Sequence, residues 1–237
     1  MPNSVHALIP AAGQSVRFGG TTLKQYAFLL GKPVIAHSIE AVKNHPAVGA
    51  VTVALAEDDG IFDDLIRPDY PDVRTVAGGE SRAHTVLNGL RFIKEHDADC
   101  EWVLVHDAAR PCLPYELLDS LLNLGQSGRN GAILATPVTD TLKQEAEEGH
   151  IGRTVDRSRL WAAQTPQFFP LASLLENLQS ALSFGSPPTD EAEAMERAGV
   201  HPLLVPGSSR NIKITGPEDL PMAEFILNQA IRSGTQP

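Results

Sequence analysis

The sequence predicts an α/β protein with a mostly parallel, twisted sheet flanked by helices. Apolar runs without polar alternation, typical of strands buried on both faces, occur at 4–12, 50–56, 102–107 and 131–138. The segments between them repeat their apolar residues at helical spacing. Buried strands that alternate with amphipathic helices form a parallel sheet with helices on both faces.

The helices and the remaining strands follow in order along the chain. Pro33 suits the first turn of a helix in which Ile35, Ile39 and Val42 share one face. The second helix is expected at 82–94, and the leucines from 117 to 124 mark the third. After the fourth apolar strand we expect helices near 170–182 and 189–198, strands near 201–206 and 210–215, and a last helix from about 217.

The pattern weakens between about 139 and 160, where the chain is polar and carries one turn signal, EEGH. We expect a projecting hairpin here. A long excursion from a compact domain usually has a function, and packing against another subunit is one such function. The sequence shows no internal repeat and no linker, so residues 1–237 are predicted to form one domain with an inserted dimerisation arm at about 139–160.

Composition and charge exclude several classes of protein. The formal net charge is −10, from 19 basic and 29 acidic residues, so a broad basic surface for nucleic acid or an anionic membrane is not expected. Two cysteines, Cys100 and Cys112, cannot build a disulfide framework or a four-thiolate zinc site. No run approaches the roughly 20 apolar residues of a membrane span, and the N-terminal apolar run lacks a basic region before it. We expect a cytoplasmic protein with reduced thiols.

The positive charge that remains is concentrated in two segments. Residues 1–39 contain Arg17 and Lys24 and no acidic residue, and residues 197–217 contain Lys213 and no acidic residue. An acidic chain with two such segments either collects its cations in one pocket or shows this distribution by chance.

Three loops are candidate ligand sites because ligands bind outside the carboxyl ends of the strands in such sheets. The first, Pro10–Gln25, is rich in small residues that let backbone N–H groups approach an anion, and Arg17 and Lys24 supply its charges. It matches neither the P-loop nor the G-x-G-x-x-G pattern. It is either a phosphate site or a glycine-rich turn with solvated basic residues.

The other candidate segments carry charged residues just after a strand or a Gly-Gly pair. HDAARP places Asp107 and Arg110 after an apolar strand, either in a site or as a surface ion pair. GGESRA opens a helix, as part of a base or anion site or as an ordinary N-cap around Ser81. His106 fits a structural role better than a catalytic one, and no nucleophile elbow supports a hydrolase triad.

Seven motifs in register resemble the 2-C-methyl-D-erythritol 4-phosphate cytidylyltransferase family. They are PAAG…R…LKQY, GGESRA, VHDAARP, PVTDTLK, TVDR…LWAAQTPQFF, TDEA and NIKITGPEDL, and they run from about residue 5 to residue 230. The resemblance implies a Rossmann-like nucleotidyltransferase fold and the cytidylyl-transfer step of the non-mevalonate isoprenoid pathway. It also implies CTP and methylerythritol phosphate as substrates, Mg²⁺ or another divalent cation, and a homodimer whose arms reach the partner's site.

The resemblance also implies roles for individual residues. Those expected around the triphosphate are Ala11, Ala12, Gly13, Arg17 and Lys24. Gly79, Glu80 and Thr85 are expected near the cytosine and Ala108 near the ribose. The methylerythritol phosphate would be surrounded by Asp107, Arg110, Thr141, Arg157 and Lys213, with Thr141 and Arg157 coming from the other subunit. Two residues depart from the family pattern, with Ser15 at a common glycine position and Leu23 at a common proline position.

The implied reaction explains the kinds of residue in these motifs. A phosphate monoester oxygen attacks the α-phosphorus of CTP and pyrophosphate leaves, so the chain needs fixed cations rather than a general base. Arg17, Lys24 and Lys213 are therefore the expected electrostatic catalysts. Asp107 would orient a substrate hydroxyl or help to hold hydrated Mg²⁺. The alternatives are a cytidylyltransferase for another polyol phosphate, such as ribitol 5-phosphate, and a non-catalytic nucleotide-binding protein.

Overall fold

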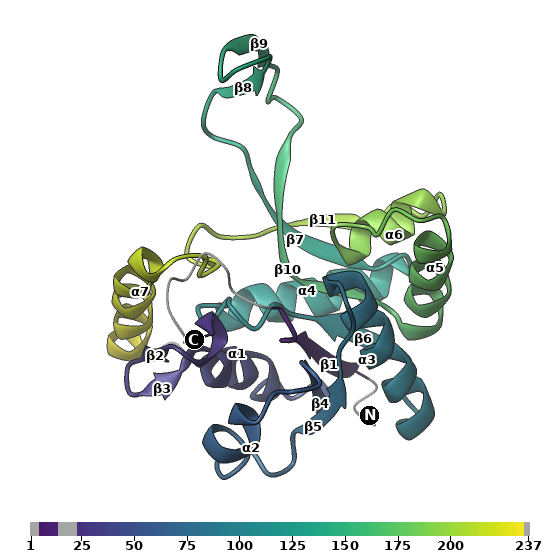
Figure 1. Ribbon diagram of the computed structural model, residues 1–237, viewed down its shortest axis with the longest axis vertical. Helices are drawn as coiled ribbons and strands as arrows, with labels where there is room; N and C mark the ends of the chain where they lie inside the picture. The colour runs from purple at the N-terminus through teal and green to yellow at the C-terminus, as the bar shows by residue number, and fades with distance from the viewer. Residues whose placement is uncertain (1–4, 14–22, 235–237) are drawn as a thin grey trace.

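A seven-stranded sheet forms the centre of the computed structural model, which describes residues 5–13 and 23–234 (Figure 1). Its strand order is β11-β7-β10-β6-β1-β4-β5. The bounds are β1 Val5–Pro10, β4 Val48–Leu55, β5 Arg74–Ala77, β6 Trp102–Val105, β7 Ala132–Pro137, β10 Trp161–Pro170 and β11 Leu203–Pro206. Only β10 runs antiparallel to its neighbours, β6 and β7, so the predicted mostly parallel sheet is confirmed.

Helices cover both faces of the sheet. Their bounds are α1 Val34–Lys43, α2 Ile61–Leu65, α3 Arg82–His96, α4 Tyr115–Gly128, α5 Leu171–Ser183, α6 Glu191–Arg197 and α7 Leu220–Ser233, with 3₁₀ turns at Lys24–Tyr26 and Pro217–Asp219. On β1, Ile9 belongs to the core under α1 and α4, whereas Leu8 belongs to the core under α3 and α5. Successive side chains of a strand point to opposite faces, which is why this strand is apolar at every position.

Two local predictions are wrong. Pro33 does not lie in the first turn of α1. It pairs in a two-stranded ribbon, β2 Phe28–Leu29 with β3 Lys32–Pro33, and caps the helix from outside. The segment 210–215 forms no strand. It crosses the carboxyl ends of the strands instead, where the Ile214 N–H donates to the carbonyl of Ala109 at 2.8 Å.

The predicted projecting arm is confirmed. Strands β8 Leu142–Glu145 and β9 Ile151–Val155 form an antiparallel hairpin that stands far from the body of the molecule in Figure 1. Its base is the end of the β7–β10 pair, where Trp161 lies opposite Pro137. None of the helices in the described part of the chain is long and apolar enough to cross a membrane.

Candidate active site

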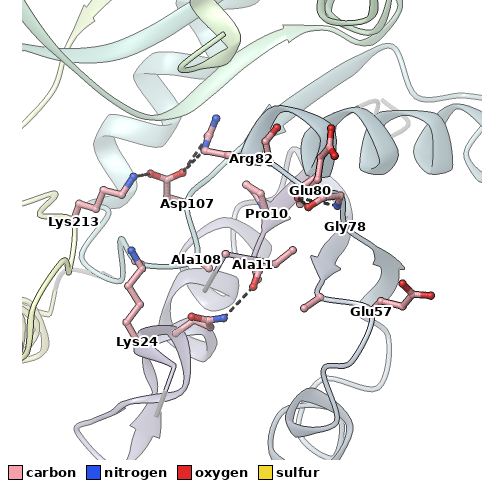
Figure 2. Close-up of a pocket in the computed structure, with 18 residues that line it drawn as sticks. Pro10, Ala11, Lys24, Glu57, Gly78, Glu80, Arg82, Asp107, Ala108 and Lys213 are labelled. Carbon is pink, nitrogen blue, oxygen red and sulfur yellow. Dashed lines mark hydrogen bonds and ion pairs between the residues drawn. The ribbon is translucent and has the colours of Figure 1, made fainter. Parts of the chain in front are cut away.

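A cavity of about 650 Å³ lies at the carboxyl ends of β1, β4 and β6 (Figure 2). The three loops after β1, β5 and β6 meet there, and the segment that follows β11 closes one side. The lining residues are Pro10–Gly13, Lys24, Gln25, Ala56, Glu57, Gly78–Arg82, Thr85, Asp107–Ala109 and Lys213. Figure 2 shows Lys24 and Lys213 on one side of this cavity, with Gly78 and Glu80 across from them.

The first wall is the small-residue segment after β1. The buried Gln25 side chain donates to the carbonyl of Ala11 at 3.0 Å, and the Ala11 N–H donates to the carbonyl of Ala54 at 2.7 Å. These bonds fix the start of the loop at the strand ends. Leu23 has φ −68° and ψ 135°, a conformation that proline also adopts, so the leucine keeps the backbone that the common proline would impose. Ser15 and Arg17 lie outside the described residues.

The second wall is the Gly-Gly segment that opens α3. The Gly78 N–H donates to the carbonyl of Leu55 at 2.6 Å, and the Gly79 N–H donates to the Thr85 hydroxyl at 3.0 Å. A Cβ on Gly78 would lie 2.5 Å from that of Ala12, so the two loops touch only because this residue is glycine. Ser81 also caps α3 by accepting from the His84 N–H. The segment is therefore both an N-cap and a cavity wall.

Asp107 lies at the centre of the charged residues, just past β6. One carboxylate oxygen accepts from Arg82 Nη2 at 3.1 Å, and the other lies 2.7 Å from Lys213 Nζ and 3.8 Å from Arg110 Nε. Burial alone would raise the pKa of the Asp107 carboxyl, but the charges of Arg82 and Lys213 outweigh it and hold that pKa well below its usual range. With 7% of Asp107 and 9% of Arg110 exposed, the surface-pair interpretation is wrong.

His106 and Arg110, near Asp107 in the sequence, are held by buried hydrogen bonds. His106 is buried, its Nε2 lies 3.0 Å from the carbonyl of Arg110, and its Nδ1 lies 3.2 Å from the Thr165 hydroxyl. The same hydroxyl accepts from the Asp107 N–H at 3.0 Å. Arg110 itself donates to the carbonyl of Asn211 at 2.6 Å. This geometry supports the structural interpretation of His106.

The structure gathers most of the predicted site residues but not all of them. Those that line the cavity are Ala11, Ala12, Gly13, Lys24, Gly79, Glu80, Thr85, Asp107, Ala108 and Lys213. Arg110 is not among the lining residues, although its Nε lies 3.8 Å from the Asp107 carboxylate. Thr141 and Arg157 are exposed on the arm, where the Arg157 guanidinium donates to the carbonyl of Thr139. Within one chain, these two do not reach the cavity.

Two residues of the site, Arg82 and Glu191, were not identified as site residues from the sequence. Arg82 lines the cavity and pairs with both Asp107 and the buried Glu191, the first residue of α6. Both residues lie within motifs that carry the family resemblance, GGESRA and TDEA. A buried carboxylate at a helix start leaves no periodic signal, so only the motifs themselves could have indicated it.

This fold and this cavity define a nucleotidyltransferase: a mostly parallel sheet opens at its strand ends into a glycine-lined pocket with two lysines. The family model described as 2-C-methyl-D-erythritol 4-phosphate cytidylyltransferase matches residues 5–229. The chain belongs to that family. Its members transfer a cytidylyl group from CTP to 2-C-methyl-D-erythritol 4-phosphate, so the predicted family, fold class and enzyme activity are confirmed.

Individual relatives agree over nearly the whole chain. The 2-C-methyl-D-erythritol 4-phosphate cytidylyltransferase of Vibrio vulnificus strain YJ016 is 46% identical over 226 residues, 95% of each chain. That of Haemophilus influenzae strain PittEE is 45% identical over 229 residues, 97% of this chain and 99% of the relative. A crystal structure of 4-diphosphocytidyl-2C-methyl-D-erythritol synthase superposes with a TM-score of 0.82 at 40% identity, covering 94% of this chain and 99% of that one. The Francisella tularensis enzyme gives 0.81 at 32% identity, with 94% and 100% covered.

Proposed function

We propose that the cavity holds CTP and methylerythritol phosphate together and that Lys24 and Lys213, with Arg17, catalyse the transfer electrostatically. The observation that carries this proposal is the position of the two lysines. They come from opposite ends of the sequence, from the two segments that lack acidic residues, and line one cavity. Arg17 belongs to the first of these segments, outside the described residues.

The chemistry requires no proton acceptor from the protein. The second pKa of a phosphate monoester is about 6, so its oxygen is already an anion at neutral pH. That oxygen forms a bond to the α-phosphorus of CTP, the bond from the α-phosphorus to the bridging oxygen of the β-phosphate breaks, and pyrophosphate leaves with the electron pair. Fixed ammonium groups stabilise the charge that develops on these oxygens.

The remaining cavity walls suit a nucleoside. The small side chains of Ala11, Ala12, Gly13 and Ala108 leave room for phosphates and ribose beside the strand ends. Across from them, the backbone of Gly79 is held in place by Thr85, whose hydroxyl donates back to the Gly79 carbonyl at 3.3 Å. Backbone groups fixed in this way can form hydrogen bonds with the amino edge of cytosine, and Glu80 lines the cavity next to Gly79.

The donor set fits a divalent cation that is held mainly by the substrate. Mg²⁺ is usually bound by one or two carboxylates together with phosphates and water. Asp107 is ionised and lines the cavity, so it would help to hold a hydrated ion through the water bound to that ion, while its own oxygens stay paired with Arg82 and Lys213. When bound, the ion would neutralise phosphate charge. The ion pair between Asp107 and Lys213 would keep the lysine in place. We expect chelation with EDTA to abolish transfer and added Mg²⁺ to restore it.

A homodimer would complete the site. Thr141 and Arg157 lie on the exposed arm, away from the cavity of their own chain, and Ile151 on the same arm leaves 67% of its surface exposed. An arm that places Arg157 over a partner's cavity would supply a bidentate donor for the substrate phosphate.

The lysine roles are tested by pyrophosphate release from CTP with methylerythritol phosphate. Lys24→Ala and Lys213→Ala should each lower turnover by about 10²–10³-fold, the usual cost of removing one preorganised donor. Lys94→Ala, on the exposed side of α3, is the control and should behave as the unaltered enzyme. Near-normal turnover in both cavity variants would rule out the electrostatic roles. The same assay with ribitol 5-phosphate distinguishes the alternative polyol substrate.

The shared site is tested by mixing two inactive chains. Arg17→Ala leaves its own arm intact, and Arg157→Ala leaves its own cavity intact. Mixed dimers of the two should therefore regain activity, because one of their two sites contains both unaltered residues. Absence of recovery in dimers shown to be mixed would contradict the sharing of residues between subunits.

A further inference from the structure

Arg82 joins two carboxylates from distant parts of the chain. Its Nη1 donates to one oxygen of Glu191 at 2.7 Å and its Nη2 to the other at 3.2 Å. Nη2 and Nε also donate to a single oxygen of Asp107, at 3.1 and 3.3 Å. Figure 2 shows Arg82, Asp107 and Lys213 in one row along the cavity edge.

The position of Glu191 is fixed by a rigid support. Only 1% of Glu191 is exposed. The N–H of the next residue, Ala192, donates to Gln167 on β10 at 2.9 Å, and Gln167 donates to Asp190 at 2.9 Å. The start of α6 is thereby tied to the central sheet, and Glu191 with it.

The same strand supports Asp107 from its backbone side. The Asp107 N–H donates to the Thr165 hydroxyl on β10. Backbone and side chain of Asp107 are therefore both positioned from elements outside its own loop, the first through Thr165 and the second through Arg82 and Glu191.

The pairing also engages most of the hydrogen-bond donors of Arg82. All three of its nitrogens already donate to carboxylate oxygens, and both oxygens of Glu191 are occupied. Two carboxyl groups surround this one guanidinium, so its hydrogen-bonding capacity is largely used within the protein. This arrangement favours a supporting role for Arg82 over phosphate binding.

Lys213 needs such a support. It lies in a segment without helix or strand, and 39% of its side chain is exposed. A lysine on a flexible stem loses rotamer freedom when it is fixed, which opposes catalysis unless the protein fixes it beforehand. The oxygen of Asp107 that Arg82 leaves available lies 2.7 Å from Lys213 Nζ.

We propose that Arg82 and Glu191 are positioning residues of the cytidylyl transfer: Glu191 orients Arg82, Arg82 fixes one oxygen of Asp107, and the other oxygen holds Lys213 at the reacting phosphate. The inference rests on the proposed role of Lys213. It assigns an effect on turnover rather than on CTP affinity to Arg82, which is engaged by two carboxyl groups, and to the buried Glu191.

Steady-state kinetics of three variants test the proposal. Arg82→Gln removes the charge and the second carboxylate contact, Arg82→Lys keeps the charge without the planar fork, and Glu191→Gln keeps the shape without the charge. Displacing a reacting group by about 1 Å costs about 10²-fold, so we expect that loss of kcat in Arg82→Gln, with the KM for CTP unchanged. Arg82→Lys and Glu191→Gln should retain intermediate kcat values.

The control is Glu196→Gln, an exposed residue on the same helix, which should leave both constants unchanged. Circular dichroism at the assay temperature measures the fraction of enzyme that is folded. Each kcat is then expressed per folded enzyme, so that a loss of folding is not mistaken for a loss of catalysis. A kcat per folded enzyme that is unchanged in all three variants would overturn the proposal, as would a raised KM for CTP with normal kcat. If the unaltered enzyme or Lys213→Ala behaves contrary to expectation, the proposed function itself fails.

Discussion

The burial of His106 makes the stability of this protein depend on pH. Burial lowers the pKa of the imidazole from 6.5 to about 4, so the folded protein keeps it neutral. One ring nitrogen faces the backbone carbonyl of Arg110 and the other the hydroxyl of Thr165, an arrangement that suits one neutral tautomer. The perturbation is a fall in pH from 7 to 5.

The sign follows from proton linkage. Below pH 6.5 the unfolded chain binds a proton at this histidine and the folded protein does not, so stability is complete above 6.5 and is lost as the pH falls towards 4. A pKa that is lower by about 2.5 corresponds to about 3 kcal/mol in full. About 2 kcal/mol of that is lost between pH 7 and pH 5.

Urea unfolding at pH 7, 6 and 5 measures this loss, at a fixed protein concentration. Trp102, which stacks on Phe168 in the core, provides a fluorescence signal. The variant His106→Gln removes the titrating group, so its free energy of unfolding should fall by about 2 kcal/mol less than that of the unaltered protein over this range. His201→Gln, at an exposed position, is the matched histidine control. Equal pH dependence in His106→Gln and the unaltered protein would refute the reasoning.

Two glycines give further predictions, one on activity and one on stability. Gly78→Ala places a Cβ 2.5 Å from that of Ala12, so the segment after β1 must move, and kcat/KM for CTP should fall on the order of 10²-fold in the pyrophosphate assay. An unchanged kcat/KM would contradict the close approach of the two loops. Gly131→Ala combines φ +80° with a clash against the Phe168 carbonyl and should cost about 3 kcal/mol in urea unfolding. Gly128→Ala, with open space around it, is the control, and equal stability of the two variants would contradict the argument.

The sequence predicted the parallel part of the sheet because its strands are buried on both faces. In β1, Leu8 and Ile9 pack against helices on opposite faces, so the apolar run is continuous and visible. Strand β10 gave no such signal. Its central residues Gln164, Thr165 and Gln167 are buried but polar, because they hold the loops around the cavity. Because these polar side chains support the site, this part of β10 has the polar composition that is typical of a loop.

The prediction of a strand at 210–215 is wrong for a related reason, because an apolar residue there is buried outside the sheet. Its apolar residue Ile214 is buried, but against the helix α7 and the loop after β6 rather than in the sheet. A short alternation of apolar and polar residues shows that one side of a segment is covered, and it does not show by which element.

The distribution of charge along the sequence indicated Lys24 and Lys213 at the cavity but not Arg82, which also lines it. Lys24 and Lys213 line the cavity and stand in segments without acidic residues, so the charge pattern of the sequence indicated both of them. Arg82 follows Glu80 in the sequence and takes its partner Glu191 from 109 positions away, so nothing near it in the sequence shows that it is paired. The charge of their sequence neighbours therefore indicated the two lysines, whereas the pairing of Arg82 with Glu191 is visible only in the fold.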